Sequence, residues 1–264
     1  MMKFLKKHII EIFLFVILLA GLSLILYPSV SNWWNSMHQS RAIASYVESV
    51  DSMSPEEIQA IFDAAYAYNE RLAEKGNNIV LSEEEEAEYE SLLNISGTGI
   101  MGYIQIPSID VYAPIYHGTE ETVLQIAIGH LNGSSLPVGG ASTHALLSGH
   151  RGLPSARLFT DLDQMEEGDI FTITVLNRTI TYQIDQIRIV LPEEVSDLDI
   201  IEGEDYCTLI TCTPYGVNSH RMLVRGRRID NLEGEEDIVV VKEAVKLPTT
   251  MVMLAIGIPL LFIL

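Results

Sequence analysis

Two long apolar stretches bracket the chain, and a more polar region lies between them. The first, residues 9–27, is broken only by Glu11, and the second, residues 247–264, contains no charged residue. At about 1.5 Å of rise per residue, a helix of either length spans roughly the hydrocarbon core of a bilayer. The pattern predicts an N-terminal membrane anchor over residues 1–28, or a cleaved signal peptide there, and a C-terminal transmembrane helix over residues 247–264.

The region from residue 29 to residue 99 has apolar positions at helical spacing. The run Ser54-Pro55-Glu56-Glu57 supplies a helix cap, a proline at the first helical position and early acids. Ser82 with Glu85 three residues later predicts a capping box at the start of a second short helix. We therefore expect a helical segment outside the membrane at residues 29–99.

From residue 100 the pattern changes to short runs of β-branched and aromatic residues separated by turns. The predicted strands are 101–106, 109–116, 144–148, 170–176, 179–190, 206–211 and 222–228. A hairpin is expected at Asn177-Arg178, and a short helix near residues 121–128. Seven short strands with turns rich in glycine and proline favour a closed β-barrel over residues 100–230, so the fold class is mainly β. An acidic linker is expected at residues 231–246.

The charge of the chain limits its partners and its location. It has 36 acidic and 16 basic residues, a formal charge of -20, which would repel a phosphate backbone. Nucleic acid is therefore not an expected partner. Lys3, Lys6 and Lys7 precede the first apolar stretch, so the positive-inside rule leaves the N-terminus in the cytoplasm. We expect a protein of the cell membrane whose barrel is extracytoplasmic.

The chain has two cysteines, Cys207 and Cys212, and both belong to one predicted strand. Five residues of extended chain separate their sulfurs by about 16 Å and point them to opposite faces, so they cannot form a disulfide within the strand. A free thiol in an oxidising compartment indicates a chemical role. Cys212, at the end of the strand, is the candidate nucleophile.

Two further residues are candidate partners of that thiol. His150 follows an apolar strand inside a run rich in glycine, where it can be partly exposed and reached by a substrate. Arg221 opens the last predicted strand, a short loop after Cys212, and adjacent antiparallel strands can place its guanidinium near the sulfur. Such a cation can stabilise an acyl oxygen as it gains negative charge. Taken singly, a histidine or an arginine of this kind is more often structural.

These residues occur in motifs that resemble a known family. The run Thr208-Leu209-Ile210-Thr211-Cys212 resembles the strand-end signature of sortases, which have an arginine on the next strand and a Gly-His pair far upstream. Further stretches resemble the class C, or pilus-assembling, branch, and they lie at residues 102–107, 114–119, 135–140, 148–154 and 211–216.

The resemblance implies an activity. Cys212 would attack the Thr-Gly bond of a Leu-Pro-x-Thr-Gly-like sorting signal, Arg221 would stabilise the oxyanion, and His150 would protonate the leaving amine. A lysine of another pilin subunit would then take the acyl group. Thr208 and Thr211 would contact the substrate, and neither a cofactor nor a metal ion is expected.

One departure and two alternatives stay open. Class C sortases often carry a lid with an Asp-Pro-aromatic motif, but this sequence has no Asp-Pro dipeptide, and the corresponding stretch is residues 77–81. A sortase that attaches proteins to peptidoglycan would have the same three catalytic residues. A non-enzymatic β-barrel scaffold of the cell surface is the alternative of another class, and it predicts no selective reactivity at Cys212.

Overall fold

The computed structural model describes residues 8–75 and 81–231 of the 264-residue chain. Four features predicted from the sequence therefore lie wholly or almost wholly outside the described residues. They are the three N-terminal lysines, the lid stretch at residues 77–81, the acidic linker at residues 231–246 and the second membrane span at residues 247–264.

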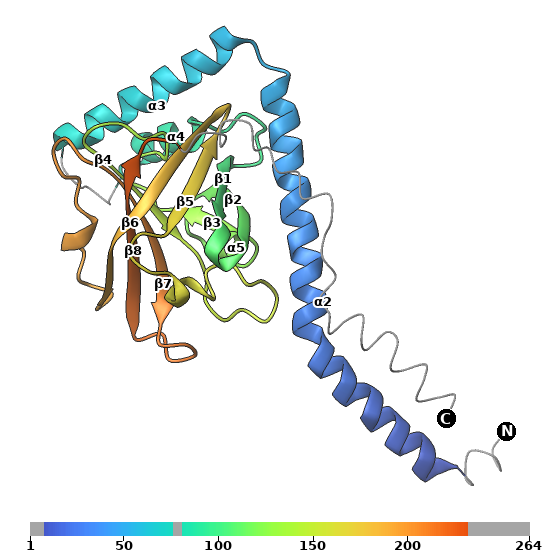
Figure 1. Ribbon diagram of the computed structural model, residues 1–264. Helices are drawn as coiled ribbons and strands as arrows, with labels where there is room; N and C mark the ends of the chain where they lie inside the picture. The colour runs from blue at the N-terminus through green and yellow to red at the C-terminus, as the bar shows by residue number, and fades with distance from the viewer. Residues whose placement is uncertain (1–7, 76–80, 232–264) are drawn as a thin grey trace.

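Within the described residues, eight strands form a closed barrel in the order β1-β2-β3-β4-β7-β8-β6-β5 (Figure 1). The strands are β1 (Ile100–Ile106), β2 (Val111–His117), β3 (Ile128–His130), β4 (Thr143–Ser148), β5 (Ile170–Val175), β6 (Arg178–Val190), β7 (Asp205–Thr213) and β8 (His220–Ile229). Short 3-10 helices lie between some of them, at η1 (Pro107–Ile109), η2 (Leu162–Gln164) and η3 (Ser196–Leu198). The predicted mainly β fold with a closed barrel is confirmed.

The segment predicted as one helix near residues 121–128 divides into two elements. Only α5 (Glu121–Leu124) is helical, and Ile128 already belongs to β3. β3 has three residues, and it is held by parallel pairing with β2 and antiparallel pairing with β4. Because these partners are distant in sequence, local helical spacing does not reveal the strand.

The turn between β5 and β6 lies one residue earlier than predicted. Val175 pairs with Arg178, so the two-residue turn is Leu176-Asn177 rather than Asn177-Arg178. Leu176 is buried, and its N–H donates a hydrogen bond to the hydroxyl of Tyr46 at 2.8 Å. This hydrogen bond to Tyr46, which lies on a helix outside the barrel, therefore holds Leu176 in the turn.

Alternation along the strands fills the barrel interior with side chains. In β5, Phe171, Ile173 and Val175 are buried, and the two threonines between them are partly exposed. Inward side chains of this kind, each stabilising the fold by about 1.5–3 kcal/mol, occupy the centre of the barrel. Polar chemistry therefore has to take place on the outside of the barrel or at its ends.

Three helices cover the outside of the barrel: α2 (Ile9–Asp51), α3 (Pro55–Lys75) and α4 (Glu83–Ser91). α2 is continuous across the predicted boundary between the anchor and the helical segment, and Pro28 lies inside it. The C-terminal half of α2 packs on the barrel through Ile43, Tyr46 and Val50. α4 begins with the predicted capping box of Ser82 and Glu85.

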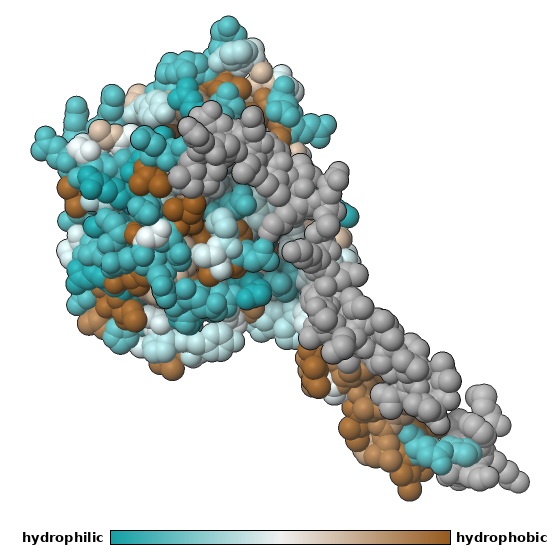
Figure 2. Space-filling model, in the orientation of Figure 1, coloured by the Kyte–Doolittle hydropathy of each residue, from teal (hydrophilic) through white to brown (hydrophobic). Residues whose placement is uncertain are grey.

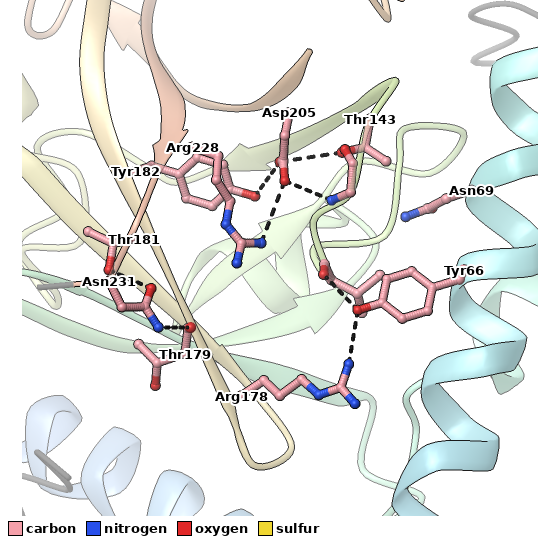
Figure 3. Close-up of polar contacts among 12 residues, drawn as sticks. Tyr66, Asn69, Thr143, Arg178, Thr179, Thr181, Tyr182, Asp205, Arg228 and Asn231 are labelled. Carbon is pink, nitrogen blue, oxygen red and sulfur yellow. Dashed lines mark hydrogen bonds and ion pairs between the residues drawn. The ribbon is translucent and has the colours of Figure 1, made fainter. Parts of the chain in front are cut away.

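Polar contacts fix the start of β7, at the barrel end near α3 (Figure 3). The Asp205 carboxylate accepts hydrogen bonds from the Tyr182 hydroxyl at 2.9 Å and from the Gly140 N–H at 2.7 Å, and it lies 3.6 Å from Arg228. Burial raises the pKa of Asp205, and these donors offset part of that effect. These contacts hold the start of β7 in place.

Candidate active site

Cys212 and Arg221 face each other across neighbouring strands. β7 and β8 are antiparallel, and their register pairs Cys212 directly with Arg221. Along β7, Cys207 and Leu209 point into the core, whereas Cys212 is partly exposed. Both cysteines are free, as predicted. Side chains at directly opposed positions have Cβ atoms about 4.5–5.5 Å apart, so the guanidinium can reach a group bound at the sulfur.

The loop that carries His150 is attached to β7 just before Cys212. β4 runs parallel to β7 in the register that pairs Ser148 with Ile210. The N–H of Gly149 donates to the carbonyl oxygen of Ile210 at 3.1 Å, and the hydroxyl of Thr211 donates to the carbonyl oxygen of Gly149 at 2.8 Å. The backbone immediately before His150 is thus bonded to two consecutive residues of β7. The structure brings the three predicted catalytic residues to one end of the barrel.

The imidazole of His150 has an acidic neighbour. Its Nε2 lies 3.2 Å from the Oε2 of Glu121, the first residue of α5. A hydrogen bond from Gln125 and the contact with His150 lower the pKa of the Glu121 carboxyl. No local pattern identifies Glu121 from the sequence, because the contact joins residues that are 29 positions apart.

The side chain of Arg221 is held by backbone oxygens. Its Nη1 donates to the carbonyl oxygens of Asn218 at 3.3 Å and of His220 at 3.2 Å. A guanidinium offers five N–H donors, and these two bonds use a single nitrogen. The remaining N–H groups are therefore candidate donors to a substrate oxygen.

Arg151 is a second residue that the sequence reasoning missed. Its side chain is 10% exposed, Nη1 donates to the hydroxyl of Thr213 at 3.2 Å, and Nη2 forms an ion pair with Asp163. Within the described part of the chain, its buried Nε has no hydrogen-bond partner. Arg151, which directly follows His150, is thus bonded to Thr213, which directly follows Cys212. A charged residue inside a run of glycine, leucine and proline is the signal that could have identified it.

The two threonines predicted to contact substrate are buried. The Oγ1 of Thr208 lies 2.7 Å from the Nε2 of His144, and Thr211 donates to Gly149 as described above. Burial lowers the pKa of His144, which favours the neutral ring. A small cavity of about 60 Å³ opens beside His144, and its other lining residues are Gly133, Ser134, Leu146, Val195, Leu198 and Asp199. Contact between these threonines and a substrate stays a prediction.

A protein-family model matches most of the barrel. A model described as "Sortase domain" matches residues 104–229, which include Cys212, His150 and Arg221. The crystal structure of sortase C1 from Streptococcus agalactiae is 53% identical, with a TM-score of 0.72, over 73% of this chain and 100% of that chain. The chain belongs to the sortase family.

Other relatives refine the assignment. Sortase C of Clostridium perfringens, whose structure was determined with the C-terminal cell wall sorting motif, is 38% identical with a TM-score of 0.62, over 72% of this chain and 99% of that chain. Sortase A of Streptococcus agalactiae serotype III (strain NEM316) is 33% identical over 43% of this chain and 47% of that protein, so the chain spans about half the length of this curated relative. The similarity to sortase C structures confirms the predicted class C resemblance.

Two expectations about the sortase site remain predictions. Among the described residues, no group of three or more histidine, cysteine and acidic side chains is placed to hold a metal ion. The lid stretch at residues 77–81 lies almost entirely outside the described residues.

Proposed function

We propose that this sortase is a membrane-anchored cysteine transpeptidase that polymerises pilins. It cleaves a Leu-Pro-x-Thr-Gly-like sorting signal and joins the acyl group to a lysine of another pilin subunit. The observation that carries the proposal is the meeting of three groups at one barrel end. Cys212 and Arg221 are opposed in register, and His150 follows a backbone bonded to the residues before Cys212.

In the first half of the reaction, the Cys212 thiolate attacks the carbonyl carbon of the signal threonine. Negative charge moves to the carbonyl oxygen, where the guanidinium of Arg221 stabilises it. The C–N bond to glycine then breaks, and protonated His150, beside Glu121, gives its proton to the leaving amine. A thioester on Cys212 remains.

In the second half, a neutral lysine amine attacks the thioester carbonyl. Its excess proton passes to His150, the C–S bond breaks, and an isopeptide bond forms. The Cys212 thiolate and protonated His150 are restored, so the cycle needs no cofactor and no metal ion. The cleaved signal is expected on the outer face of β4 and β7, near the cavity beside His144 and above Thr208.

The proposed location at the membrane is supported by α2. Among the described residues, α2 is the one helix long and apolar enough to cross a membrane, by length and composition. With the lysines before it on the cytoplasmic side, the barrel lies outside the cell. Pilins and the membrane are therefore the proposed partners of the chain.

Peptide trapping tests this function. The full chain is incubated with sorting-signal peptides, and intact-mass spectrometry is used to look for a thioacyl adduct on Cys212, with Cys212→Ala as the control. Adding a pilin domain with an acceptor lysine, or a peptidoglycan stem peptide with a free amine, then separates pilin polymerisation from wall anchoring. An adduct absent with every signal peptide, or equal in Cys212→Ala, contradicts the proposed chemistry.

A further inference from the structure

The anchor helix passes directly from its apolar half to its barrel-packing half. Its most apolar window has a mean hydropathy of 2.9 and is not buried by protein, whereas Ile43 is buried against the barrel. Tyr27, Trp33 and Trp34 lie between these two parts, and Tyr27 and Trp34 are exposed. Aromatic residues of this kind gather where a membrane helix meets the headgroups. The membrane surface therefore crosses α2 near these residues.

At the same level, α2 bonds the loop that carries His150. The side-chain oxygen of Asn32 accepts from the N–H of Arg157 at 2.9 Å, and the side-chain amide of Asn35 donates to the carbonyl oxygen of Ser155 at 2.7 Å. One turn further along α2, the side-chain amide of Gln39 donates to the carbonyl oxygen of Ile126, just after α5, at 2.6 Å. The segment of α2 that leaves the membrane is thus attached to the catalytic end of the barrel.

The loop after β7 lies at this same end of the barrel. In Figure 1, the loop after β7 lies at the end of the barrel from which the apolar half of α2 extends. Helix α3 lies across the opposite end. Figure 2 shows the apolar surface of α2 beginning beside the barrel. Tyr215 and Val217 on this loop are 63% and 70% exposed. Large exposed apolar side chains beside a membrane anchor indicate a contact with lipid.

We propose that the catalytic end of the barrel rests on the outer surface of the bilayer, with Tyr215 and Val217 in contact with lipid. The chain has a net charge of -20, so the contact is apolar rather than an attraction to anionic headgroups. Two apolar side chains are enough for this contact with lipid, because α2 already anchors the chain and keeps the loop close to the bilayer surface. The inference rests on the membrane anchoring in the proposed function and does not depend on the transpeptidase chemistry.

This placement selects a class of substrate. Cys212 lies three residues before Tyr215, so its sulfur is held close to the headgroups. A sorting signal in a protein that is itself tethered to the membrane reaches such a site at high local concentration. A freely soluble peptide gains no such advantage.

Fluorescence quenching by labelled lipids tests the contact. Cys212→Ala removes the accessible thiol, and Cys207 is fully buried, so a single new cysteine can carry a bimane label. The full chain with Val217→Cys is placed in phosphatidylcholine nanodiscs that contain lipids with a nitroxide on the headgroup or on carbon 5 of an acyl chain. We expect these lipids to reduce the emission at least about twofold, since interfacial side chains lie about 5–10 Å into this boundary.

Two matched positions complete the experiment. Ile201 is 44% exposed on the loop before β7, at the opposite end of the same strand, and a label there should be unaffected by either lipid. Leu19 is 43% exposed in the apolar half of α2, and a label there should be quenched most by a nitroxide deeper in the acyl chain. Quenching at Leu19 but none at Val217 overturns the docking and leaves the anchor intact. No quenching at Leu19 overturns both.

Discussion

Replacing Arg221 by lysine separates the positive charge from the planar donor group at the active site. Arg221 is opposed to Cys212, and its Nη1 is held by the carbonyl oxygens of Asn218 and His220. A lysine amine keeps the charge, but it holds it as a point at the end of a flexible stem and lacks the planar fork of donors that a guanidinium presents. If Arg221 orients the oxyanion, the variant loses a donor that acts in the transition state.

The size of the loss follows from comparable sites. Removing one oxyanion donor costs about 10²–10³ in rate, or roughly 2.7–4 kcal/mol of transition-state stabilisation. We therefore expect Arg221→Lys to form the thioester at least about a hundredfold more slowly than the parent chain. Alkylation of Cys212 by a small reagent should remain, because no oxyanion forms in that reaction.

The assay measures single-turnover thioester formation by quenched-flow mass spectrometry, with iodoacetamide alkylation in parallel. Arg225→Lys is the matched control, because Arg225 lies four residues further along β8 and makes a two-bond ion pair with Asp185 at 2.9 and 2.8 Å. It should keep near-normal turnover. Near-normal turnover in Arg221→Lys would refute the oxyanion role, and a parallel loss of alkylation would identify Arg221 as an activator of Cys212 instead.

Three further predictions concern the thiols, Arg151 and acid stability. Cys212→Ala should abolish peptide cleavage while the fold stays intact by circular dichroism, and Cys207→Ala should retain peptide cleavage. The reverse result would show that Cys212 is not the nucleophile. Arg151→Met should lower the free energy of unfolding by about 2–4 kcal/mol in urea titration, since a charge-assisted hydrogen bond and a partly buried ion pair are lost. Arg188→Met breaks a more exposed ion pair and should cost under about 1 kcal/mol. Equal costs for the two variants would contradict the buried role of Arg151. Burial lowers the pKa of His130 from 6.5 to about 4, so the folded chain keeps the ring neutral while the unfolded chain protonates it. Stability should therefore fall by about 3 kcal/mol as the pH drops from 6.5 to 4, and an unchanged slope in His130→Gln would contradict this.

The strands of the barrel were predictable because they are alternating and bounded by turns. β5 and β7 show this most clearly, with buried residues at every second position of β5 and β7 ending before Pro214. β3 was not predictable, because three residues carry too little pattern and the pairing with β2 and β4 is a long-range effect. The turn at Leu176 was misplaced by one residue, since the contact with Tyr46 is invisible in the local sequence.

The candidate site divides in the same way. The pairing of Cys212 with Arg221 was predictable from the sequence, because a short loop joins the two antiparallel strands that carry them. The position of His150 follows from parallel pairing of β4 with β7 across about sixty residues, and the family resemblance indicated it where spacing did not. Glu121 and the anchor residue Asn35 reach this loop from still more distant parts of the chain. No local pattern identifies contacts of this range.

The arrangement of β7 explains how a barrel with a filled interior can hold a reactive thiol precisely. Cys207 and Leu209 point inward and are fully buried, so the strand cannot rotate without losing core packing. Cys212 lies on the other face because an odd spacing reverses the side chain. The start of the strand is bonded through Asp205, and near its end Thr211 is bonded to Gly149. The same strand thus places the sulfur relative to the core and holds the backbone before His150, so a shift in β7 would displace the nucleophile and the acid together rather than separate them.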